Sequence, residues 1–294
     1  MDGGQLMHRI RSKKDIQANK IILLAIILTL FGILIYRTNS YFKQVEVQTT
    51  QAVIKKGPGI EYKNKEHLAQ GERLKIIKTK YHWIYVKTSQ NKFGWVADWM
   101  IGPNYKNQIN SLSDATIVLD PGHGGQDSGA VSSTNKDEKK YTLRYADQTA
   151  RKLRATGAKV YLTRTKDTTV SLNSRPRLAQ QVHADAFISF HFDSAPEANI
   201  ASGYTTYYYH TGASLRLADN VNHQLKRLGL DNRGVDLGDF LVIRDNTQPA
   251  ILLEMGYINS ERDFDKITSV FYENKVTSQI VAGLKNYFKS TKQD

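Results

Sequence analysis

The hydrophobic pattern of the chain begins with an uninterrupted apolar run near the N-terminus. Residues 21–36 read IILLAIILTLFGILIY and carry no charge. At a rise of about 1.5 Å per residue, this run is slightly shorter than a hydrocarbon layer of about 30 Å, and flanking residues can complete the span. Because the run is apolar on every side and has basic flanks, it does not resemble a buried helix of a soluble domain. It therefore predicts one transmembrane helix.

The charges around this run predict how it crosses the membrane. Five basic residues precede it and two follow closely, namely Arg9, Arg11, Lys13, Lys14, Lys20, Arg37 and Lys43. The positive-inside rule then makes residues 1–20 a cytoplasmic tail and places the rest of this single-pass membrane protein outside the cell. A cleaved signal peptide is the competing interpretation, but Thr38-Asn39-Ser40 is a poor cleavage site. We therefore expect a retained anchor, with the lipid bilayer as a partner of residues 21–36.

A small all-β domain is predicted over residues 41–102. Short alternating or apolar runs such as RLKIIK, WIYVK and GWVADWMI are separated by turn signals, among them Lys56-Gly57-Pro58-Gly59. The order of GERLKII at 71–77, HWIYV at 82–86 and GWV at 94–96 resembles a bacterial SH3-like wall-associated domain. The residues before Gly57 depart from the common pattern, which weakens the expectation of a ligand in the usual groove. The alternative is a spacer barrel whose Trp and Tyr residues are simply core.

Beyond a polar, non-periodic stretch at 103–114, predicted to be a linker, the pattern alternates between strands and helices. Short β-rich runs at 117–119, 159–162, 186–190 and 251–253 are interleaved with helical periodicity at 138–156 and 215–228. This alternation predicts an α/β domain over 115–294 with a largely parallel sheet. In such sheets, functional residues collect beyond the carboxyl ends of the strands.

Composition narrows the chemistry that this domain can use. The chain has no cysteine, which removes disulfides, thiolate nucleophiles and cysteine metal ligands. The net charge of +13 is uneven: residues 41–102 carry +6, whereas residues 115–294 carry only +3. A nucleic-acid enzyme usually places its basic excess around the working site, so nucleic acid is not expected as a partner. An anionic surface such as lipid headgroups or a wall polymer fits the distribution better, although a merely soluble basic surface would also produce it.

Three candidate site residues follow predicted strands. His123 lies in Asp120-Pro121-Gly122-His123-Gly124-Gly125, directly after the first strand of the α/β segment. His191 closes the strand at 186–190, and Glu254 closes the strand at 251–253. A carboxylate after a fully apolar strand is costly unless it meets a cation, a proton or a hydrogen-bond donor. Taken singly, each residue also has an ordinary interpretation as a satisfied or solvated side chain.

Glu138 is the fourth candidate, at the predicted start of a helix, where a carboxylate is also an ordinary helix-terminus residue. Two histidines and one glutamate with an open fourth position form a known catalytic zinc arrangement. Zinc in such a site lowers the pKa of a bound water to about 7 and polarises a carbonyl group. A second carboxylate that is not a ligand could then move the proton of the water to the leaving nitrogen.

Residues 115–290 resemble the zinc-dependent N-acetylmuramoyl-L-alanine amidases with the Asp-Pro-Gly-His-Gly-Gly signature. Several ordered motifs carry the resemblance, namely DPGHGGQDSGA at 120–130, Glu138-Lys139 with Leu143, Leu162-Thr163-Arg164 with Asp167, Ser171-Leu172 with Arg175, ADAFISFH at 184–191, Asn232-Arg233-Gly234-Val235, and PAILLEMGYINS at 249–260. The resemblance implies that the mostly parallel sheet is twisted and flanked by helices. It also implies one zinc ion bound by His123, Glu138 and His191, with Glu254 as the catalytic glutamate. The implied reaction is hydrolysis of the peptidoglycan amide between N-acetylmuramic acid and the L-alanine of the stem peptide.

The sequence also departs from the pattern of that family. Phe192-Asp193 and Ala179-Gln180 each stand where the family commonly has Ala-Asn. We expect Phe192 to narrow the groove beside the metal and Asp193 to add a negative charge there. With the anchor and the short spacer, these departures suggest the hypothesis that a membrane protein activates the enzyme. Arg164 and Arg175 could be structural or could orient the substrate.

Two other functions are compatible with these sequence features. One is a zinc peptidase that cuts within the stem peptide. The other is a non-catalytic wall-binding or scaffold protein with a vestigial metal site, although the presence of all four candidate residues argues against it.

Overall fold

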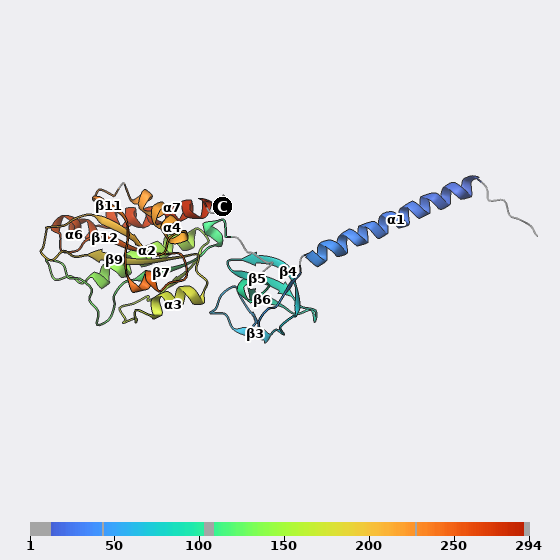
Figure 1. Ribbon diagram of the computed structural model, residues 1–294, viewed down its shortest axis with the longest axis horizontal. Helices are drawn as coiled ribbons and strands as arrows, with labels where there is room; N and C mark the ends of the chain where they lie inside the picture. The colour runs from blue at the N-terminus through green and yellow to red at the C-terminus, as the bar shows by residue number, and fades with distance from the viewer. Residues whose placement is uncertain (1–12, 43, 103–108, 227, 291–294) are drawn as a thin grey trace, which may run out of the picture. The chain divides into compact units, whose positions relative to one another are not determined.

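The computed structural model describes residues 13–42, 44–102, 109–226 and 228–290 (Figure 1). Residues 1–12 of the predicted cytoplasmic tail and residues 103–108 of the predicted linker lie outside them. The described chain falls into two compact units. We call them the β unit, residues 13–56, 64–78 and 84–102, and the α/β unit, residues 57–63, 79–83 and 109–290.

The first helix, α1, spans Lys13–Phe42 and contains the predicted membrane segment. Within it, Asn19–Thr38 is long and apolar enough to cross a bilayer, judged by length and composition, with a mean hydropathy of 2.4. Its large apolar side chains are exposed, as those of Leu24 and Phe31 illustrate. This helix is a candidate anchor or signal segment.

The β unit contains a six-stranded sheet with strand order β1-β4-β5-β6-β2-β3. Its strands are β1 (Gln44–Glu46), β2 (Val53–Lys55), β3 (Asn64–His67), β4 (Arg73–Lys80), β5 (Trp83–Lys87) and β6 (Phe93–Ala97), followed by the 3-10 turn η1 (Asp98–Met100). The pairs β1–β4, β2–β3 and β2–β6 are antiparallel. Alternate residues such as Ile84, Val86 and Val96 point into one apolar core. The all-β prediction for this segment is confirmed, whereas its SH3-like character stays a prediction.

The α/β unit is built on a second six-stranded sheet, with strand order β11-β10-β12-β9-β7-β8. Its strands are β7 (Thr116–Pro121), β8 (Lys159–Leu162), β9 (Ala186–Asp193), β10 (Tyr204–Tyr208), β11 (Asn232–Leu237) and β12 (Ala250–Tyr257). Four of its five neighbouring pairs are parallel, and β10 runs antiparallel to β12. The sheet is therefore mixed rather than purely parallel.

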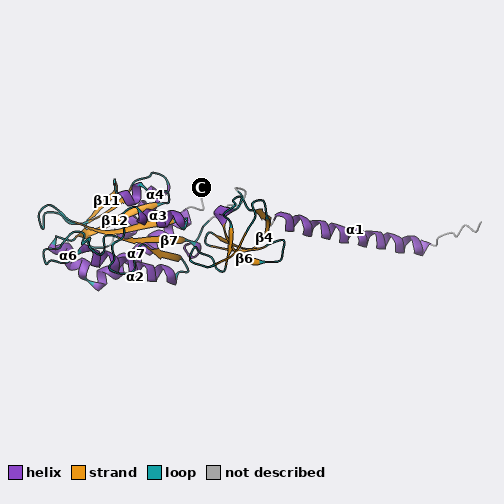
Figure 2. Ribbon diagram, turned by 90° about the horizontal axis from the view of Figure 1, so that it is seen from below, coloured by secondary structure: helices purple, strands orange, loops and turns teal. Residues whose placement is uncertain are grey.

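Helices flank this sheet on both faces (Figure 2). They are η2 (Leu112–Asp114), α2 (Glu138–Ala155), α3 (Ser174–Gln181), α4 (Ala213–Leu225), α5 (Leu241–Arg244), α6 (Glu261–Thr268) and α7 (Val270–Ser290). The larger apolar core lies on one face and joins the sheet to α2, α4, α6 and α7. A smaller core on the other face joins the sheet to α3 and α5. The predicted arrangement of helices around a sheet is confirmed.

Three of the predicted strands, β7, β9 and β12, are longer than predicted, and in β9 and β12 this changes the position of the candidate residues. The predicted runs at 186–190 and 251–253 become β9 and β12, which continue to Asp193 and Tyr257. His191 and Glu254 therefore lie within strands rather than after them. They are register partners on adjacent parallel strands. Adjacent partners point to the same face of a sheet, so strand pairing alone places these two side chains beside each other.

The end of the predicted linker is folded into the α/β unit. Ser111 caps η2 by accepting a hydrogen bond from the backbone N–H of Ser113. Leu112 is only 6% exposed and belongs to the larger core, against which Ile109 also packs. Ile109 and Leu112 are thus part of the packed structure rather than of a spacer.

We predict that Leu112→Ala lowers the free energy of unfolding of the α/β unit by about 2–4 kcal/mol, because it opens a cavity in the larger core. Asp114→Ala, two residues away on the exposed side of the same turn, should change it by less than about 0.5 kcal/mol. Denaturant unfolding followed by circular dichroism measures both. Equal, small effects would show that residues 109–114 are a spacer and not part of the core.

Candidate metal centre

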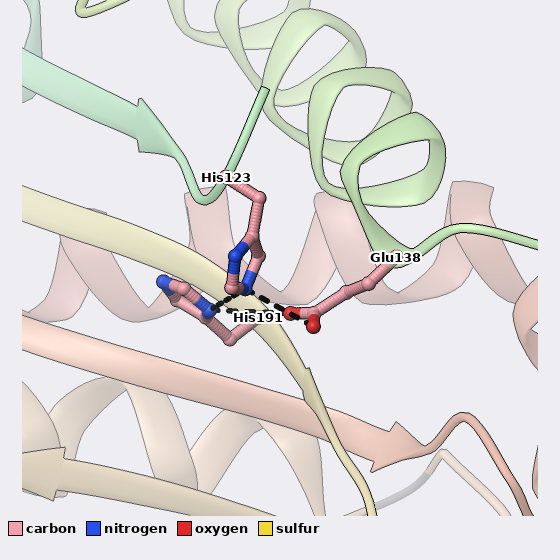
Figure 3. A group of neighbouring side chains, drawn as sticks. All are labelled: His123, Glu138 and His191. Atoms are coloured by element: carbon pink, nitrogen blue, oxygen red, sulfur yellow. Dashed lines mark hydrogen bonds and ion pairs between the residues drawn. The ribbon is translucent and has the colours of Figure 1, made fainter. Parts of the chain in front are cut away.

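Three side chains from distant parts of the sequence converge near the carboxyl ends of the adjacent strands β7 and β9 of the α/β sheet (Figure 3). His123 comes from the turn after β7, Glu138 from the first residue of α2, and His191 from β9. One ligand atom from each lies within 4.8 Å of the others. Among the described residues, no other group of His, Asp and Glu meets this geometry.

The distances within the cluster identify which atoms face the centre. Nε2 of His123 lies 3.1 Å from Oε2 of Glu138, and Nδ1 of His191 lies 3.1 Å from Oε1. The two ring nitrogens are themselves 3.1 Å apart. Two nitrogen lone pairs and a carboxylate directed at one point are the donor set that suits a divalent transition metal such as zinc.

Glu138 is held in its ionised form by its surroundings. It is 3% exposed, and burial alone would raise the pKa of its carboxyl group. Hydrogen bonds with His123 and His191, together with their charges, outweigh burial and hold that pKa well below its ordinary value. The backbone N–H groups of Ala130 and Phe192 also donate to its two oxygens, each at 2.9 Å. A fixed, ionised carboxylate is ready to bind a cation.

Asp127 is a site residue that the sequence patterns did not single out. Nδ1 of His123 lies 3.0 Å from both oxygens of its carboxylate. Although burial opposes it, hydrogen bonding and charge from Glu138 and Asp127 raise the pKa of His123. If Nε2 binds a metal, the ring proton is on Nδ1. Nδ1 then donates a hydrogen bond to the carboxylate of Asp127, and this hydrogen bond fixes the orientation of the ring. An Asp four residues after a histidine in a glycine-rich loop was the available sequence signal.

Two buried arginines hold the backbone of the loop that carries His123. Arg164 donates to the carbonyl oxygens of Pro121 at 3.0 Å and Gly122 at 2.8 Å. Arg175 donates to the carbonyl oxygens of Pro121 at 2.9 Å and His123 at 3.0 Å. Each side chain is at most 4% exposed. Of the two roles considered from the sequence, the structure therefore gives both arginines the structural one.

Glycine is required where the loop touches the cluster. A Cβ on Gly122 would lie 2.3 Å from Cε1 of His191. A Cβ on Gly129 would lie 2.6 Å from Oε2 of Glu138 and 2.7 Å from Cδ2 of His123. Gly129 also has a φ of +67°, which favours glycine. No other residue fits at either position without moving a member of the cluster.

Glu254 lies beside the cluster and contributes a second carboxylate. Its Oε2 is buried and has no hydrogen-bond partner among the described residues. Burial, followed by the negative charges of Glu138 and Asp193, raises the pKa of its carboxyl group well above the ordinary value. An unpartnered buried carboxylate oxygen is costly, and a proton or a nearby cation relieves that cost. This atom is independent support for a cation at the cluster.

The two departures after His191 differ in their structural effect. Phe192 was expected to narrow the groove, and that expectation is wrong. It is 2% exposed and packs edge-to-face against Tyr145, with ring centres 5.2 Å apart, because alternation along β9 turns it into the core, away from the face of His191. Asp193 lies two residues after His191 and acts electrostatically on Glu254, in agreement with the charge expected there.

An α/β sheet that brings two imidazoles and a carboxylate together beside a second, buried carboxylate is the construction of a metal-dependent hydrolase. Comparison with known families assigns the particular kind. The chain belongs to the N-acetylmuramoyl-L-alanine amidase family Amidase_3, whose model matches residues 117–286. It is accordingly a peptidoglycan amidase, which cleaves the bond between N-acetylmuramic acid and L-alanine.

Individual relatives agree with this assignment. The chain is 36% identical over 291 residues to a probable cell wall amidase, LytH, of Staphylococcus aureus, covering 95% of this chain and 97% of LytH. An N-acetylmuramoyl-L-alanine amidase from Clostridium difficile 630 is 33% identical, with a TM-score of 0.58 over 62% of this chain and 98% of that one. The catalytic domain of the amidase CwlV from Bacillus (Paenibacillus) polymyxa is 34% identical, with a TM-score of 0.57 over 59% of this chain and 97% of that domain.

We predict that Gly129→Ala weakens zinc binding at least about tenfold, because the added methyl group displaces Glu138 or His123. Gly212→Ala is the matched control. Gly212 has a similar φ of +73°, but no atom lies within 4 Å of the position that its Cβ would occupy, so this variant carries the backbone strain alone. Isothermal titration of the metal-free protein with zinc measures both affinities. Equal losses in the two variants would contradict the steric explanation.

We further expect Asp127→Asn to lower zinc affinity by about 10–100-fold, because the amide no longer provides a charged acceptor for Nδ1 of His123. Asp137→Asn is a suitable control, since Asp137 is next to Glu138 in sequence and its ion pair with Lys139 is a long one, at 3.9 Å. The same titration distinguishes them. Unchanged affinity in Asp127→Asn would mean that Asp127 does not orient the ring.

Proposed function

We propose that the chain performs its amidase reaction with one zinc ion held by His123, Glu138 and His191, and with Glu254 as the general base. The observation that carries this proposal is the convergence of three ligand atoms beside the buried, unpartnered Oε2 of Glu254. Bound there, zinc would polarise the scissile carbonyl group and acidify a water molecule.

The residues of the chain supply the remaining steps. Glu254 accepts the proton of the attacking water and then delivers it to the nitrogen of L-alanine as the C–N bond breaks. A raised pKa suits this exchange, because the group must both take and release a proton near neutral pH. Asp127 and the two loop arginines keep His123 in place throughout, so the site needs little rearrangement.

We propose that residues 21–36 anchor the enzyme in the membrane, with residues 1–20 in the cytoplasm and the α/β unit outside the cell. The exposed apolar surface of α1 supports a lipid environment, and the basic residues before it support the orientation. The substrate would then be peptidoglycan close to the membrane. Activation by a membrane protein stays a hypothesis, and equal activity of the full chain in the absence and presence of its native membrane would contradict it.

We predict that Glu254→Gln abolishes the release of stem peptides, lowering the rate at least about a thousandfold, because the amide cannot accept a proton. Zinc affinity should change little, since Glu254 is not a ligand. The zinc-loaded full chain is incubated with purified peptidoglycan, and the products are identified by mass spectrometry. Products that begin at L-alanine, absent with the variant, support the proposal.

The same experiment separates the alternative functions. New ends within the stem peptide would indicate a zinc peptidase. Full biological function of Glu254→Gln, with no product from either protein, would favour a wall-binding scaffold.

A further inference from the structure

One face of the β unit combines aromatic rings with lysine side chains, and the amidase reaction makes no use of it. The half-buried Tyr85 on β5 and the exposed Phe93 on β6 are stacked, with ring centres 6.4 Å apart. Trp95 is only 8% exposed, and its ring centre lies 5.2 Å from that of Tyr85. These residues alternate with the core residues Ile84, Val86 and Val96, so they occupy the opposite, outer face of the sheet.

Two lysines lie over these rings. Nζ of Lys78 is 5.2 Å from the ring centre of Tyr85 and 5.5 Å from that of Trp95. Nζ of Lys87 is 5.7 Å from the ring centre of Phe93. These contacts leave both ammonium groups without a carboxylate partner within the described part of the chain. We call Lys78, Tyr85, Lys87, Phe93 and Trp95 the Lys–aromatic face.

The strands of this face carry basic side chains. The parts of β4, β5 and β6 that belong to the β unit contain Arg73, Lys75, Lys78 and Lys87 and no Asp or Glu, although Arg73 is the register partner of Glu46 on β1. These three strands are neighbours in the sheet. Phe93 is 39% exposed, and Ile77, which precedes Lys78 on β4, is 49% exposed. A surface whose lysines have no carboxylate partner and whose apolar groups are exposed is complementary to a negatively charged surface with an apolar layer beneath it.

Because the β unit is covalently linked to α1, the surface of the membrane that α1 would span is the anionic surface always close to the β unit. One residue separates the end of α1 at Phe42 from the start of β1 at Gln44. If α1 spans the bilayer, no part of the β unit lies farther from the lipid headgroups than about the diameter of the β unit itself. Lysines near an anionic bilayer gain electrostatic attraction, and aromatic residues favour the depth at which headgroups meet acyl chains.

We propose that the Lys–aromatic face docks on the anionic lipid surface of the membrane in which α1 is anchored. An anchor through α1 alone attaches the enzyme to the membrane at one place. A second attachment through lysines and aromatic rings holds the β unit on the bilayer surface. This inference rests on the anchoring by α1 proposed above, and it concerns a surface separate from the zinc centre.

The test uses the full chain in nanodiscs and exploits the absence of cysteine. A fluorophore is attached at Ile77→Cys, beside the face, or at His67→Cys on the edge strand β3 as the control position. Quenching by a lipid-borne quencher is compared between discs containing phosphatidylglycerol and discs of phosphatidylcholine alone. We expect the label at residue 77 to be quenched about threefold more strongly in the anionic discs, and the label at residue 67 to be indifferent to the lipid.

Substitutions then identify the groups responsible. Lys78→Gln with Lys87→Gln should remove the difference at residue 77. Lys56→Gln with Lys63→Gln removes the same charge from exposed lysines of the 55–63 segment and should leave the difference in place. Raising the salt concentration should weaken the quenching, because screening reduces the attraction. Thermal melts verify that both double variants remain folded.

Several results would overturn the inference. Equal quenching at residues 67 and 77, or equal quenching in both lipids, would show that the face does not select the anionic surface. A response of the label at residue 77 to soluble poly(glycerol phosphate) in neutral discs, without a response to phosphatidylglycerol, would assign the face to a wall polymer instead. Failure of the chain to enter discs would contradict both the proposed anchoring by α1 and the proposed docking of the Lys–aromatic face. Entry into discs without quenching at residue 77 would contradict only the docking.

Discussion

The buried ion pair between Asp120 and Arg175 is the interaction on which the metal centre depends. Nη1 of Arg175 lies 2.8 Å from Oδ1 of Asp120, and both side chains are almost fully buried. Thr163 and Ser189 donate to the same carboxylate, so its charge is well satisfied. Removing one partner of such a pair typically costs about 3–5 kcal/mol, because a buried charge is left uncompensated. Since Nη1 and Nη2 of Arg175 also donate to the carbonyl oxygens of Pro121 and His123, the pair also fixes the backbone on which His123 stands.

A concentration of negative charge explains why this arrangement calls for a cation. Glu138 and Asp193 both act electrostatically on Glu254, and both histidines already interact with Glu138. The surrounding fold does not neutralise Glu254, whose inner oxygen has no partner in the described chain. A divalent ion at the cluster would offset the negative charges of these carboxylates. The same crowding of carboxylates that raises the pKa of Glu254 therefore favours the binding of a cation.

The charge of the chain differs between its middle and its C-terminal part. Residues 115–294 contain the candidate site and carry a net charge of only +3, whereas the shorter segment 41–102 carries +6. An enzyme whose substrate is a large, immobile polymer benefits from attachment, because the effective concentration of substrate then depends on position rather than on diffusion. In the proposals made above, the apolar α1 and the basic strands of the β unit are two physically different means of attachment, and neither uses a residue of the candidate metal centre.

The sequence alone determined those features that depend on local patterns. The uncharged run at 21–36, the alternation of strands and helices after Ala115, and the identities of His123, Glu138, His191 and Glu254 all follow from short-range signals in the chain. Tertiary structure decided what depends on pairing across the sheet. Strand pairing extended β9 and β12, made His191 and Glu254 neighbours and turned Phe192 into the core. The roles of Arg164 and Arg175 also needed the folded chain, because a side chain that binds backbone carbonyl groups tens of residues away leaves no periodic signal in the sequence.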